Sequence, residues 1–239
     1  MELKGKNAIV TGAGRGIGRE IALQLGAQGV NVLAVSRTLA EVERTAADIS
    51  KMGVLGTALA ADISNNEDIV RIVDAAQSAF GSIDILVNNA GVLMHDGIDD
   101  LNEADWDKTM SINVRGTAFL SRAVMLKMKA NEESYVINIS STAALGAKPD
   151  VTSYSVSKYG VTGLTEALYK YGRDYNIRVS AIFPGVTDTE MLQSADMPCT
   201  QDMLMKPSDI AYCVLFLLRS PARMIVKEVV PWATKFDKI

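Results

Sequence analysis

Short runs of β-branched and other apolar residues alternate along this chain with longer segments in which apolar positions recur at helical spacing. The short runs predict strands at Asn7–Thr11, Val30–Ser36, Val54–Ala61, Ile83–Asn88, Tyr135–Ser140, Arg178–Phe183 and Met224–Val230. The longer segments predict helices at Ile17–Gln28, Leu39–Lys51, Glu67–Phe80, Glu103–Lys129, Ser153–Tyr175 and Ser208–Leu218. Strands that alternate with crossover helices build a doubly wound α/β fold, so we expect a parallel sheet of about seven strands with helices on both faces and a ligand crevice at its carboxyl edge.

The chain has 239 residues, a length at which α/β sheets commonly form one domain. No Pro/Ser-rich linker, internal repeat or low-complexity tract divides it. We therefore expect a single domain over residues 1–239. Residues 186–207 are irregular and rich in methionine, and they are equally consistent with a flexible substrate lid and with a plain surface excursion.

Composition narrows the functional classes. The net charge is −4, without a basic cluster that could neutralise a run of phosphates, so we expect no nucleic-acid partner. The first residues lack the apolar core of a signal peptide and no apolar run could span a bilayer, so we expect a cytoplasmic protein with no membrane association. Cys199, Cys213 and the single histidine, His95, predict packing or loop positions and no metal site.

A glycine-rich loop lies between the first predicted strand and the first predicted helix. Its sequence is Thr11-Gly12-Ala13-Gly14-Arg15-Gly16-Ile17-Gly18. Glycines there permit a tight turn and bring backbone N–H groups close to a pyrophosphate, although glycine also simply ends strands. The placement between a strand and a helix favours dinucleotide binding.

The spacing TGxxxGxG resembles that of the short-chain dehydrogenase/reductase (SDR) family, and two later motifs extend the resemblance. Asp62 and Ile63 follow the third predicted strand, where the family has an acid that contacts adenine. The sequence Asn88-Asn89-Ala90-Gly91 follows the fourth and matches the family's NNAG motif, which supports the sheet and lines the cofactor cleft. The resemblance implies a Rossmann-like fold and cofactor contacts from Gly12, Gly14, Arg15, Gly16, Ile17, Gly18, Asp62, Ile63, Asn89, Ala90 and Gly91.

The end of the second predicted strand indicates which nicotinamide cofactor is used. An acid there would bind the ribose hydroxyls of NAD and repel the 2′-phosphate of NADP, but this chain has Ser36-Arg37-Thr38. Arg37 and Arg15 could bracket a phosphate with charge-assisted hydrogen bonds, and Ser36 could add a neutral one. Any single arginine is by default a solvated surface residue. Two at these positions, with no acid opposing them, predict NADP(H) in preference to NAD(H).

Tyr154 and Lys158 are candidates for proton transfer, because four residues of helix place their side chains one turn apart on one face. A free phenol has a pKa of about 10, and a nearby cation favours the phenolate. Ser141, at the end of the fifth predicted strand, could reach the crevice and polarise a carbonyl. Taken alone, the pair is more often a surface pair and Asn113 more often a local backbone hydrogen-bonder. Their order along the chain, together with the glycine motifs, favours catalysis.

The resemblance implies a role for each of these residues. Tyr154 protonates the carbonyl oxygen during reduction, Ser141 stabilises that oxygen, and Lys158 lowers the tyrosine pKa and binds the nicotinamide ribose. Tyr154 and Lys158 are therefore also expected cofactor contacts. Asn113 holds a water that links Lys158 to solvent.

The segment after the sixth predicted strand, Pro184-Gly185-Val186-Thr187-Asp188-Thr189, is similar to the family's PG motif. The similarity implies that Pro184, Gly185, Val186 and Thr189 hold the carboxamide and phosphates of the cofactor. The ending, Val229-Val230-Pro231-Trp232-Ala233-Thr234, departs from the VDGG-type sequence of many bacterial members and is faintly similar to the branch that acts on short hydroxy acids. The departure leaves the mode of assembly, a homodimer or a homotetramer, open.

These features predict an NADP(H)-dependent oxidoreductase that reduces a small carbonyl compound to an alcohol. A 3-oxoacyl-(acyl-carrier-protein) reductase and a short 3-hydroxy acid dehydrogenase are the alternatives. Asn131-Glu132-Glu133 and Asp174-Tyr175-Asn176 would not attract an acidic carrier protein, which argues for a free small substrate. A non-catalytic NADP-binding sensor is the alternative of another class. An epimerase of the extended branch is disfavoured by the TGxxxGxG spacing and by the short C-terminal part.

Overall fold

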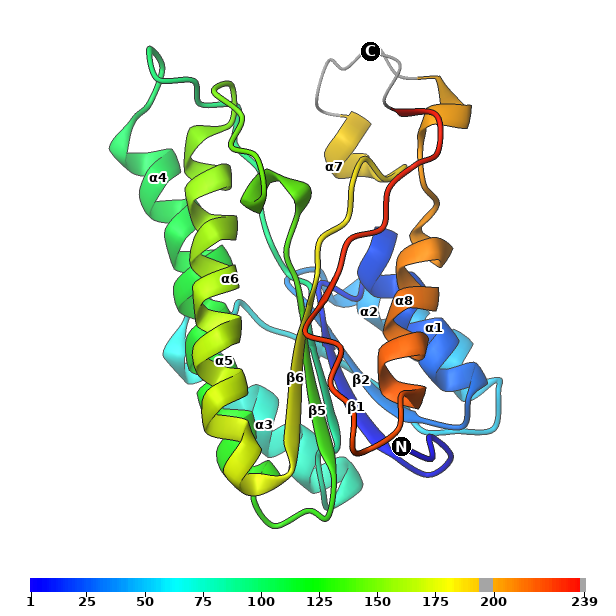
Figure 1. The fold of residues 1–239 in the computed structure, drawn as a ribbon. Coiled ribbons are helices and arrows are strands. Elements are labelled where there is room, and N and C mark those ends of the chain that lie inside the picture. Colours follow the sequence, from blue (N-terminus) through cyan, green and yellow to red (C-terminus); the bar gives the residue numbers. More distant parts are fainter. Residues whose placement is uncertain (194–199, 237–239) are drawn as a thin grey trace.

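A parallel sheet forms the centre of the molecule (Figure 1). The computed structural model describes residues 1–193 and 200–236. The strands are β1 (Asn7–Thr11), β2 (Asn31–Ser36), β3 (Gly56–Ala60), β4 (Ile85–Asn88), β5 (Ser134–Ile139), β6 (Ile177–Ile182) and β7 (Glu228–Val229). Their order across the 7-stranded sheet is β3-β2-β1-β4-β5-β6-β7, and every neighbouring pair is parallel. Successive strands are added on one side of β1 up to β3 and on its other side from β4 onward. Ligands bind at the carboxyl edge of such a switch point, here between β1 and β4. The predicted doubly wound Rossmann-like fold is confirmed.

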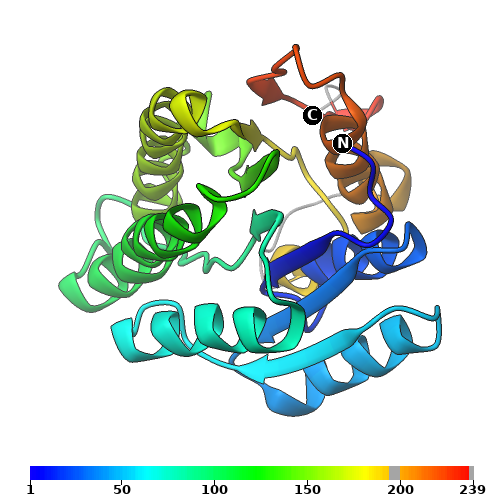
Figure 2. The ribbon, with the colours of Figure 1, turned by 90° about the horizontal axis from the view of Figure 1, so that it is seen from below.

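Helices cover both faces of the sheet, as Figure 2 shows from below. One layer consists of α1 (Gly16–Ala27), α2 (Leu39–Ser50) and α8 (Pro207–Arg219). The other consists of α3 (Asn66–Phe80), α4 (Glu103–Met110), α5 (Thr117–Met128) and α6 (Thr152–Gly172). Each layer packs its apolar stripe on the sheet, so β1, β4, β5 and β6 are buried along their whole length. Burial on both faces explains why these strands are mostly apolar and do not alternate strictly between apolar and polar residues.

The helix predicted at Glu103–Lys129 differs from expectation in its centre. Between α4 and α5 the backbone takes a π-helical form over Ser111–Gly116. Such wide turns are rare and occur mostly at functional sites. Gly116 lies at the end of this turn because a Cβ there would come within 2.7 Å of the carbonyl oxygen of Ile63. The end of the π-helical turn therefore packs closely against the loop after β3.

The last predicted strand is shorter than the apolar run Met224–Val230 suggested. Only Glu228 and Val229 form β7, at the edge of the sheet, although the tail accepts hydrogen bonds from β6 and its extension at Lys227, Val229 and Pro231. Pro231 has no N–H to donate, which limits strand pairing at this end. No helix in the described part of the chain is long and apolar enough to cross a membrane.

The irregular segment at residues 186–207 contains two short helical pieces, α7 (Glu190–Gln193) and a 3₁₀ turn at Gln201–Met203. Its two ends meet, because Asp188 donates a backbone hydrogen bond to Met205 and Met205 donates one to Val186. Residues 194–199 of this segment lie outside the described residues. A parallel β-bridge between Thr187 and Met205 thus joins the two ends of the segment.

Candidate active site

The glycine loop connects β1 to α1 with a backbone that only glycine adopts easily. Gly12 has φ of +65° and Gly16 has φ of +54°, in the left-handed region. A Cβ on Gly18 would collide with the carbonyl oxygen of Gly12, so this glycine lets α1 pack directly under the loop. Arg15, at the N-cap position of α1, makes no side-chain capping hydrogen bond in the described structure. The first N–H groups of α1 are therefore not capped by the residue that normally supplies this contact.

The NNAG segment is fastened to this loop by hydrogen bonds. The Thr11 hydroxyl accepts hydrogen bonds from the backbone N–H groups of Asn89 and Ala90, both at 3.0 Å. The Asn89 amide donates to the carbonyl oxygen of Thr11 at 3.0 Å. Asn88 points the other way, donating to Ser121 and Asn138 inside the core. The two asparagines thus join the carboxyl ends of β1, β4 and β5 and fix the floor of the crevice.

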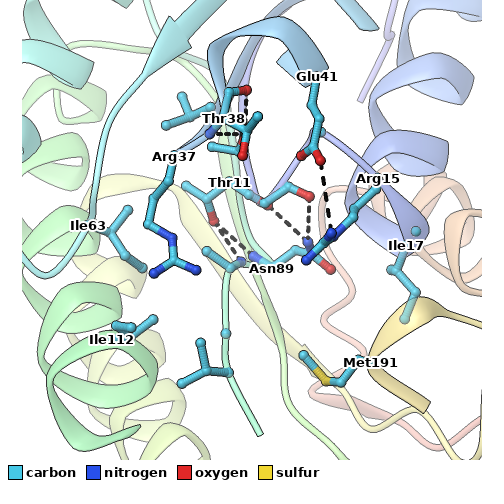
Figure 3. A pocket seen from close by; sticks show the side chains of 18 of the residues that line it. Thr11, Arg15, Ile17, Arg37, Thr38, Glu41, Ile63, Asn89, Ile112 and Met191 are labelled. Carbon is cyan, nitrogen blue, oxygen red and sulfur yellow. Dashed lines mark hydrogen bonds and ion pairs between the residues drawn. The ribbon is translucent and has the colours of Figure 1, made fainter. Parts of the chain in front are cut away.

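A cavity of about 480 Å³ opens above this floor. Figure 3 shows side chains from the glycine loop, the end of β2, the loops after β3 and β4, and α7 around one space. Its wall contains these residues expected from the sequence: Gly12, Gly14, Arg15, Gly16, Ile17, Ser36, Arg37, Asp62, Ile63, Asn89, Ala90, Gly91 and Thr189. The carboxylate of Asp62 accepts hydrogen bonds from Ser64. Six other residues expected to contact the cofactor are not in the wall of this cavity: Gly18, Tyr154, Lys158, Pro184, Gly185 and Val186.

The wall also contains residues to which the sequence analysis assigned no cofactor contact: Thr11, Val35, Thr38, Glu41, Ala61, Val92, Leu93, Met94, Ile112, Glu190 and Met191. Most of them directly precede or follow a motif, so extending each motif by two or three residues would have found them. Glu190 and Met191 are the first two residues of α7 and directly follow Thr189, the last residue of the PG segment. Their presence brings the start of the irregular segment to the cavity.

Arg15, one of the two arginines expected to bind a phosphate, lies beside acids, so the expectation that no acid opposes these arginines is wrong for this residue. A guanidinium nitrogen of Arg15 lies 2.6 Å from a carboxylate oxygen of Glu190 and 3.9 Å from one of Glu41 (Figure 3 draws the Glu41 pair). Glu41 lies in the first turn of α2, and a Cβ on Gly14 would meet its side chain. Arg37 reaches into the same cavity near Ile63 (Figure 3). The Ser36 hydroxyl is hydrogen-bonded to the backbone of Thr38.

Tyr154 and Lys158 lie one turn apart on α6, as their spacing predicts. The ammonium of Lys158 donates to the carbonyl oxygen of Ile139 at 3.0 Å and lies 5.4 Å from the centre of the Tyr154 ring. Burial lowers the pKa of Lys158 to about 8. Burial also raises the pKa of Tyr154, and a hydrogen bond with Ser141 acts against this rise. In the protein alone, burial therefore outweighs the expected lowering of the tyrosine pKa.

Ser141 and Asn113 approach this pair from two other elements. Ser141 lies two residues beyond β5, at the start of a 3₁₀ turn, and its hydroxyl accepts a hydrogen bond from the N–H of Ala143. Asn113 lies in the π-helical turn and is buried. Its amide exchanges two hydrogen bonds with the backbone of Val92 and donates a third to Ser157. The side chain of Asn113 thus ties the wall after β4 to the helix that bears Tyr154.

Gly91 connects the catalytic candidates to the cavity. A Cβ on this glycine would lie 3.2 Å from the amide oxygen of Asn113 and 3.7 Å from the ammonium of Lys158, and Gly91 itself lines the cavity. The structure thus gathers Asn113, Ser141, Tyr154 and Lys158 at the carboxyl edge of β4 and β5, next to the end of the cavity opposite Arg15. One elongated site has charged groups at one end and a phenol, a hydroxyl and an ammonium at the other.

The PG segment lies beside the C-terminal tail. Gly185 donates a backbone hydrogen bond to Pro231, and a Cβ on Gly185 would come within 3.1 Å of the ring of Trp232. Trp232 in turn packs edge-on against Phe236. Lys235 forms an ion pair of 2.9 Å with Asp202 in the irregular segment. The tail that departs from the expected pattern therefore lies along the outer side of the catalytic end.

Comparison with known proteins agrees with this arrangement. The model of the short chain dehydrogenase family matches residues 6–199. A sepiapterin reductase of Chlorobaculum tepidum is 36% identical over 237 residues, covering 96% of both chains. The crystal structure of a 3-ketoacyl-(acyl-carrier-protein) reductase from Brucella melitensis complexed with NADH has a TM-score of 0.91 and 32% identity, covering 98% of this chain and 99% of that one. A putative short-chain alcohol dehydrogenase from Sinorhizobium meliloti 1021 has a TM-score of 0.89 and 31% identity, covering 100% and 99%.

Proposed function

The chain belongs to the short-chain dehydrogenase family and is an oxidoreductase, and from this premise we propose that it reduces a small-molecule carbonyl to an alcohol with NADPH, using Tyr154 as the proton donor. The observation that carries the proposal is the juxtaposition of Tyr154, Ser141 and Lys158 with the Gly91 end of the cavity. A reducible carbon placed there would have a hydroxyl on one side and a cofactor-sized cavity on the other.

The residues of the cavity fit a nicotinamide dinucleotide. The volume of about 480 Å³ lies within the range of small-molecule sites. The uncapped first turn of α1 offers backbone N–H groups to a pyrophosphate, and Gly12 and Gly16 let the loop approach it. The Brucella melitensis structure was solved with NADH, which supports the same cofactor class here. When bound, the cofactor supplies the hydride.

The side chains around Tyr154 would control the transfer of its phenolic proton to the substrate oxygen. Its raised pKa keeps the phenol protonated at neutral pH, as a general acid requires. The Ser141 hydroxyl hydrogen-bonds the phenol and is placed to share the substrate oxygen with it. After the phenol has given up its proton, the nearby ammonium of Lys158 stabilises the phenolate. The phenolate is then reprotonated by way of Lys158, which we propose is linked to solvent through a water held by Asn113.

The preference for NADPH rests on Arg15 and Arg37 at the far end of the cavity. Both are cations at a site where no acid ends β2, and a 2′-phosphate would take up their charge. Glu41 and Glu190 now compete for Arg15. We propose that the dianionic phosphate outcompetes these carboxylates, since it offers more acceptors and more charge.

The substrate is proposed to be a free carbonyl compound of small size. Leu93, Met94 and Met191 give the cavity an apolar side, and methionine adapts to ligands of irregular shape. The name of the Chlorobaculum tepidum relative, a reductase of sepiapterin, supports a free substrate. The name of the Brucella melitensis neighbour keeps a carrier-linked 3-oxoacyl substrate as the alternative that the experiment must address.

We also propose a homodimer or homotetramer that forms through α5 and α6, the helices before and after β5 along the chain. Exposed apolar side chains lie on α5, at Phe119 and Leu126, and on α6, at Tyr159 and Tyr171. Light scattering after size-exclusion chromatography measures this directly. A monomer at micromolar concentration would contradict the proposal.

The experiment is to follow NADPH and NADH consumption with diketones, 3-oxo esters, semialdehydes and acetoacetyl thioesters, free and linked to carrier protein. Tyr154→Phe removes the proton donor and should lower turnover about 10²- to 10⁴-fold. Tyr212→Phe changes an exposed tyrosine on α8, away from the site and the proposed interface, and is the matched control. A preference for NADH would overturn the cofactor assignment, and one for the carrier-linked thioester would overturn the substrate class. Tight NADPH binding without turnover in either direction would indicate a non-catalytic sensor.

A further inference from the structure

Asp96 is a buried carboxyl-bearing residue to which no motif assigns a role. It lies in the loop after β4, five residues beyond Gly91, and only 1% of its surface is exposed. Its loop contains two other aspartates, Asp99 and Asp100, and both are exposed. Burying a carboxyl group is costly unless the group has a specific partner. The contacts of Asp96 therefore indicate what the residue does.

Asp96 meets the first turn of the helix that carries the catalytic candidates. One carboxylate oxygen accepts a hydrogen bond from the N–H of Ser153 at 3.3 Å. The backbone oxygen of Asp96 accepts another from the N–H of Thr152 at 3.1 Å. Thr152 and Ser153 are the first two residues of α6, and their N–H groups have no partner within the helix. Asp96 thus caps α6 from a position 57 residues earlier in the chain.

The capped turn is the one that holds Tyr154. Tyr154 is the third residue of α6, directly after Ser153. Val151, at the N-cap position, makes no side-chain capping hydrogen bond in the described structure, and an apolar residue cannot supply one. The first turn of a helix frays when its N–H groups lack partners. The orientation of the Tyr154 phenol therefore depends on a cap that comes from elsewhere in the chain.

Two further contacts fix the same turn to its surroundings. The hydroxyls of Ser153 and Thr109 lie 3.3 Å apart, and both residues are completely buried. This contact ties the start of α6 to α4. A Cβ on Gly97 would come within 3.5 Å of the carbonyl oxygen of Pro149, so the loop with Asp96 also packs on the segment that enters α6. Asp96 is thus held in place by residues on both sides.

The second carboxylate oxygen of Asp96 is buried and has no hydrogen-bond partner in the part of the chain that the structure describes. A residue retained only for packing would avoid this cost. An acidic group at a helix N-terminus, however, interacts favourably with the positive end of the helix dipole. The first turn of α6 gains from both effects, a hydrogen bond and a favourable electrostatic contact.

We propose that Asp96 is a positioning residue for catalysis, which holds the first turn of α6 so that the Tyr154 phenol meets the substrate oxygen. The inference rests on the proposed function, because it concerns the proton donor of that reaction. It predicts a defect in the chemical step that leaves the distant cofactor contacts unchanged. A displacement of about 1 Å can cost about 10²-fold in rate.

The experiment compares Asp96→Ala, Asp96→Leu and Asp96→Asn with Asp99→Ala, an exposed aspartate in the same loop. Alanine and leucine remove the acceptor, so kcat should fall by about 10- to 100-fold, while KM and the Kd for NADPH stay within about twofold. Asparagine keeps an acceptor oxygen and should restore kcat to within about threefold. The deuterium isotope effect on kcat, measured with NADPH labelled at the transferred position, should rise in the alanine and leucine variants as hydride transfer limits turnover.

Several outcomes separate this inference from the proposed function. If Tyr154→Phe abolishes turnover but Asp96→Ala and Asp96→Leu keep kcat and the isotope effect of the parent protein, the positioning role is wrong. If NADPH affinity falls in parallel with kcat, Asp96 supports the whole site and the specific role is also wrong. If alanine and leucine prevent folding, asparagine decides: kcat reduced more than about tenfold would overturn the claim that an acceptor oxygen is what α6 needs. Failure of Tyr154→Phe to reduce turnover would instead overturn the proposed function.

Discussion

The two ends of the cavity are held in shape by different means. At the glycine-loop end, backbone geometry does most of the work: Gly12 and Gly16 adopt left-handed conformations, and Gly18 lets α1 pack against the loop. At the catalytic end, side chains from separate segments are brought together, and one of them, Lys158, is a buried cation. The glycine loop shapes its end of the cavity without burying a charged side chain. The catalytic end does bury one, and this lowers the stability of the fold.

The largest expected effect tests the cost of the buried cation at the catalytic end. Lys158→Met should lower turnover by about 10³-fold, since the neighbouring phenol loses the cation that stabilises its phenolate. The same change should raise the free energy of unfolding at pH 7 by up to roughly 3 kcal/mol, because the pKa of Lys158 falls from 10.5 to about 8 on folding. The lost hydrogen bond to Ile139 will offset part of this gain.

The burial of Lys158 also makes the stability of the protein depend on pH. The folded-state pKa of Lys158 is below its unfolded value, so between about pH 8 and pH 10.5 the unfolded chain holds a proton that the folded chain has released. The stability contribution of this residue should therefore rise with pH across that window and be absent in Lys158→Met. Denaturant titrations at pH 7 and pH 9.5 measure it. Lys170→Met, an exposed lysine on the same helix, is the control, and an equal stability change in both variants would refute the burial argument.

The second prediction tests the backbone-built end. Gly18→Ala places a methyl group against the carbonyl oxygen of Gly12, so α1 must move away from the loop. We expect a loss of about 2–3 kcal/mol in stability and a rise in the Kd for NADPH of about 100-fold, because the phosphate-binding backbone moves with the helix. Gly163→Ala is the matched control, since a Cβ on this helical glycine would meet open space and should stabilise α6 slightly. Equal cofactor affinity in the two variants would show that the loop is more adaptable than its geometry implies.

The same contrast explains what could be predicted from the sequence. The order of strands and helices and the residues of the glycine-loop end follow from local signals, namely apolar periodicity and glycine spacing. The contacts at the catalytic end depend on long-range packing. Asp96 accepts a hydrogen bond from Ser153, 57 residues away, and it is indistinguishable in sequence from the exposed aspartates that follow it. At the glycine-loop end, the ion pair of Arg15 with Glu190 also joins residues 175 positions apart, and local signals do not predict it. The π-helical turn at Asn113 also leaves no local signal, because it accompanies a long-range contact, the close approach of Gly116 to the loop after β3.

A third prediction concerns the competition between Glu190 and a cofactor phosphate for Arg15. Arg15→Ala should raise the KM for NADPH about tenfold and leave the KM for NADH within about twofold, because only NADPH carries a 2′-phosphate for this cation. Glu190→Gln should do the opposite and lower the KM for NADPH, since it frees Arg15 from its nearest carboxylate. Steady-state kinetics with both cofactors provide the test. Equal effects of Arg15→Ala on both cofactors would show that Arg15 acts on the shared part of the dinucleotide instead.

The smallest effects are expected in the C-terminal tail, which lies along the catalytic end without lining the cavity. Trp232→Ala removes the ring that covers Gly185 and should raise the substrate KM by about two- to fivefold with little change in kcat, because the PG segment loses packing on one side only. Lys235→Ala breaks an exposed ion pair with Asp202 and should change KM by less than about twofold, since exposed pairs contribute little. Kinetics of both variants against one good substrate measure the difference. If Lys235→Ala matched or exceeded Trp232→Ala, charge and not apolar packing would hold the tail against the catalytic end.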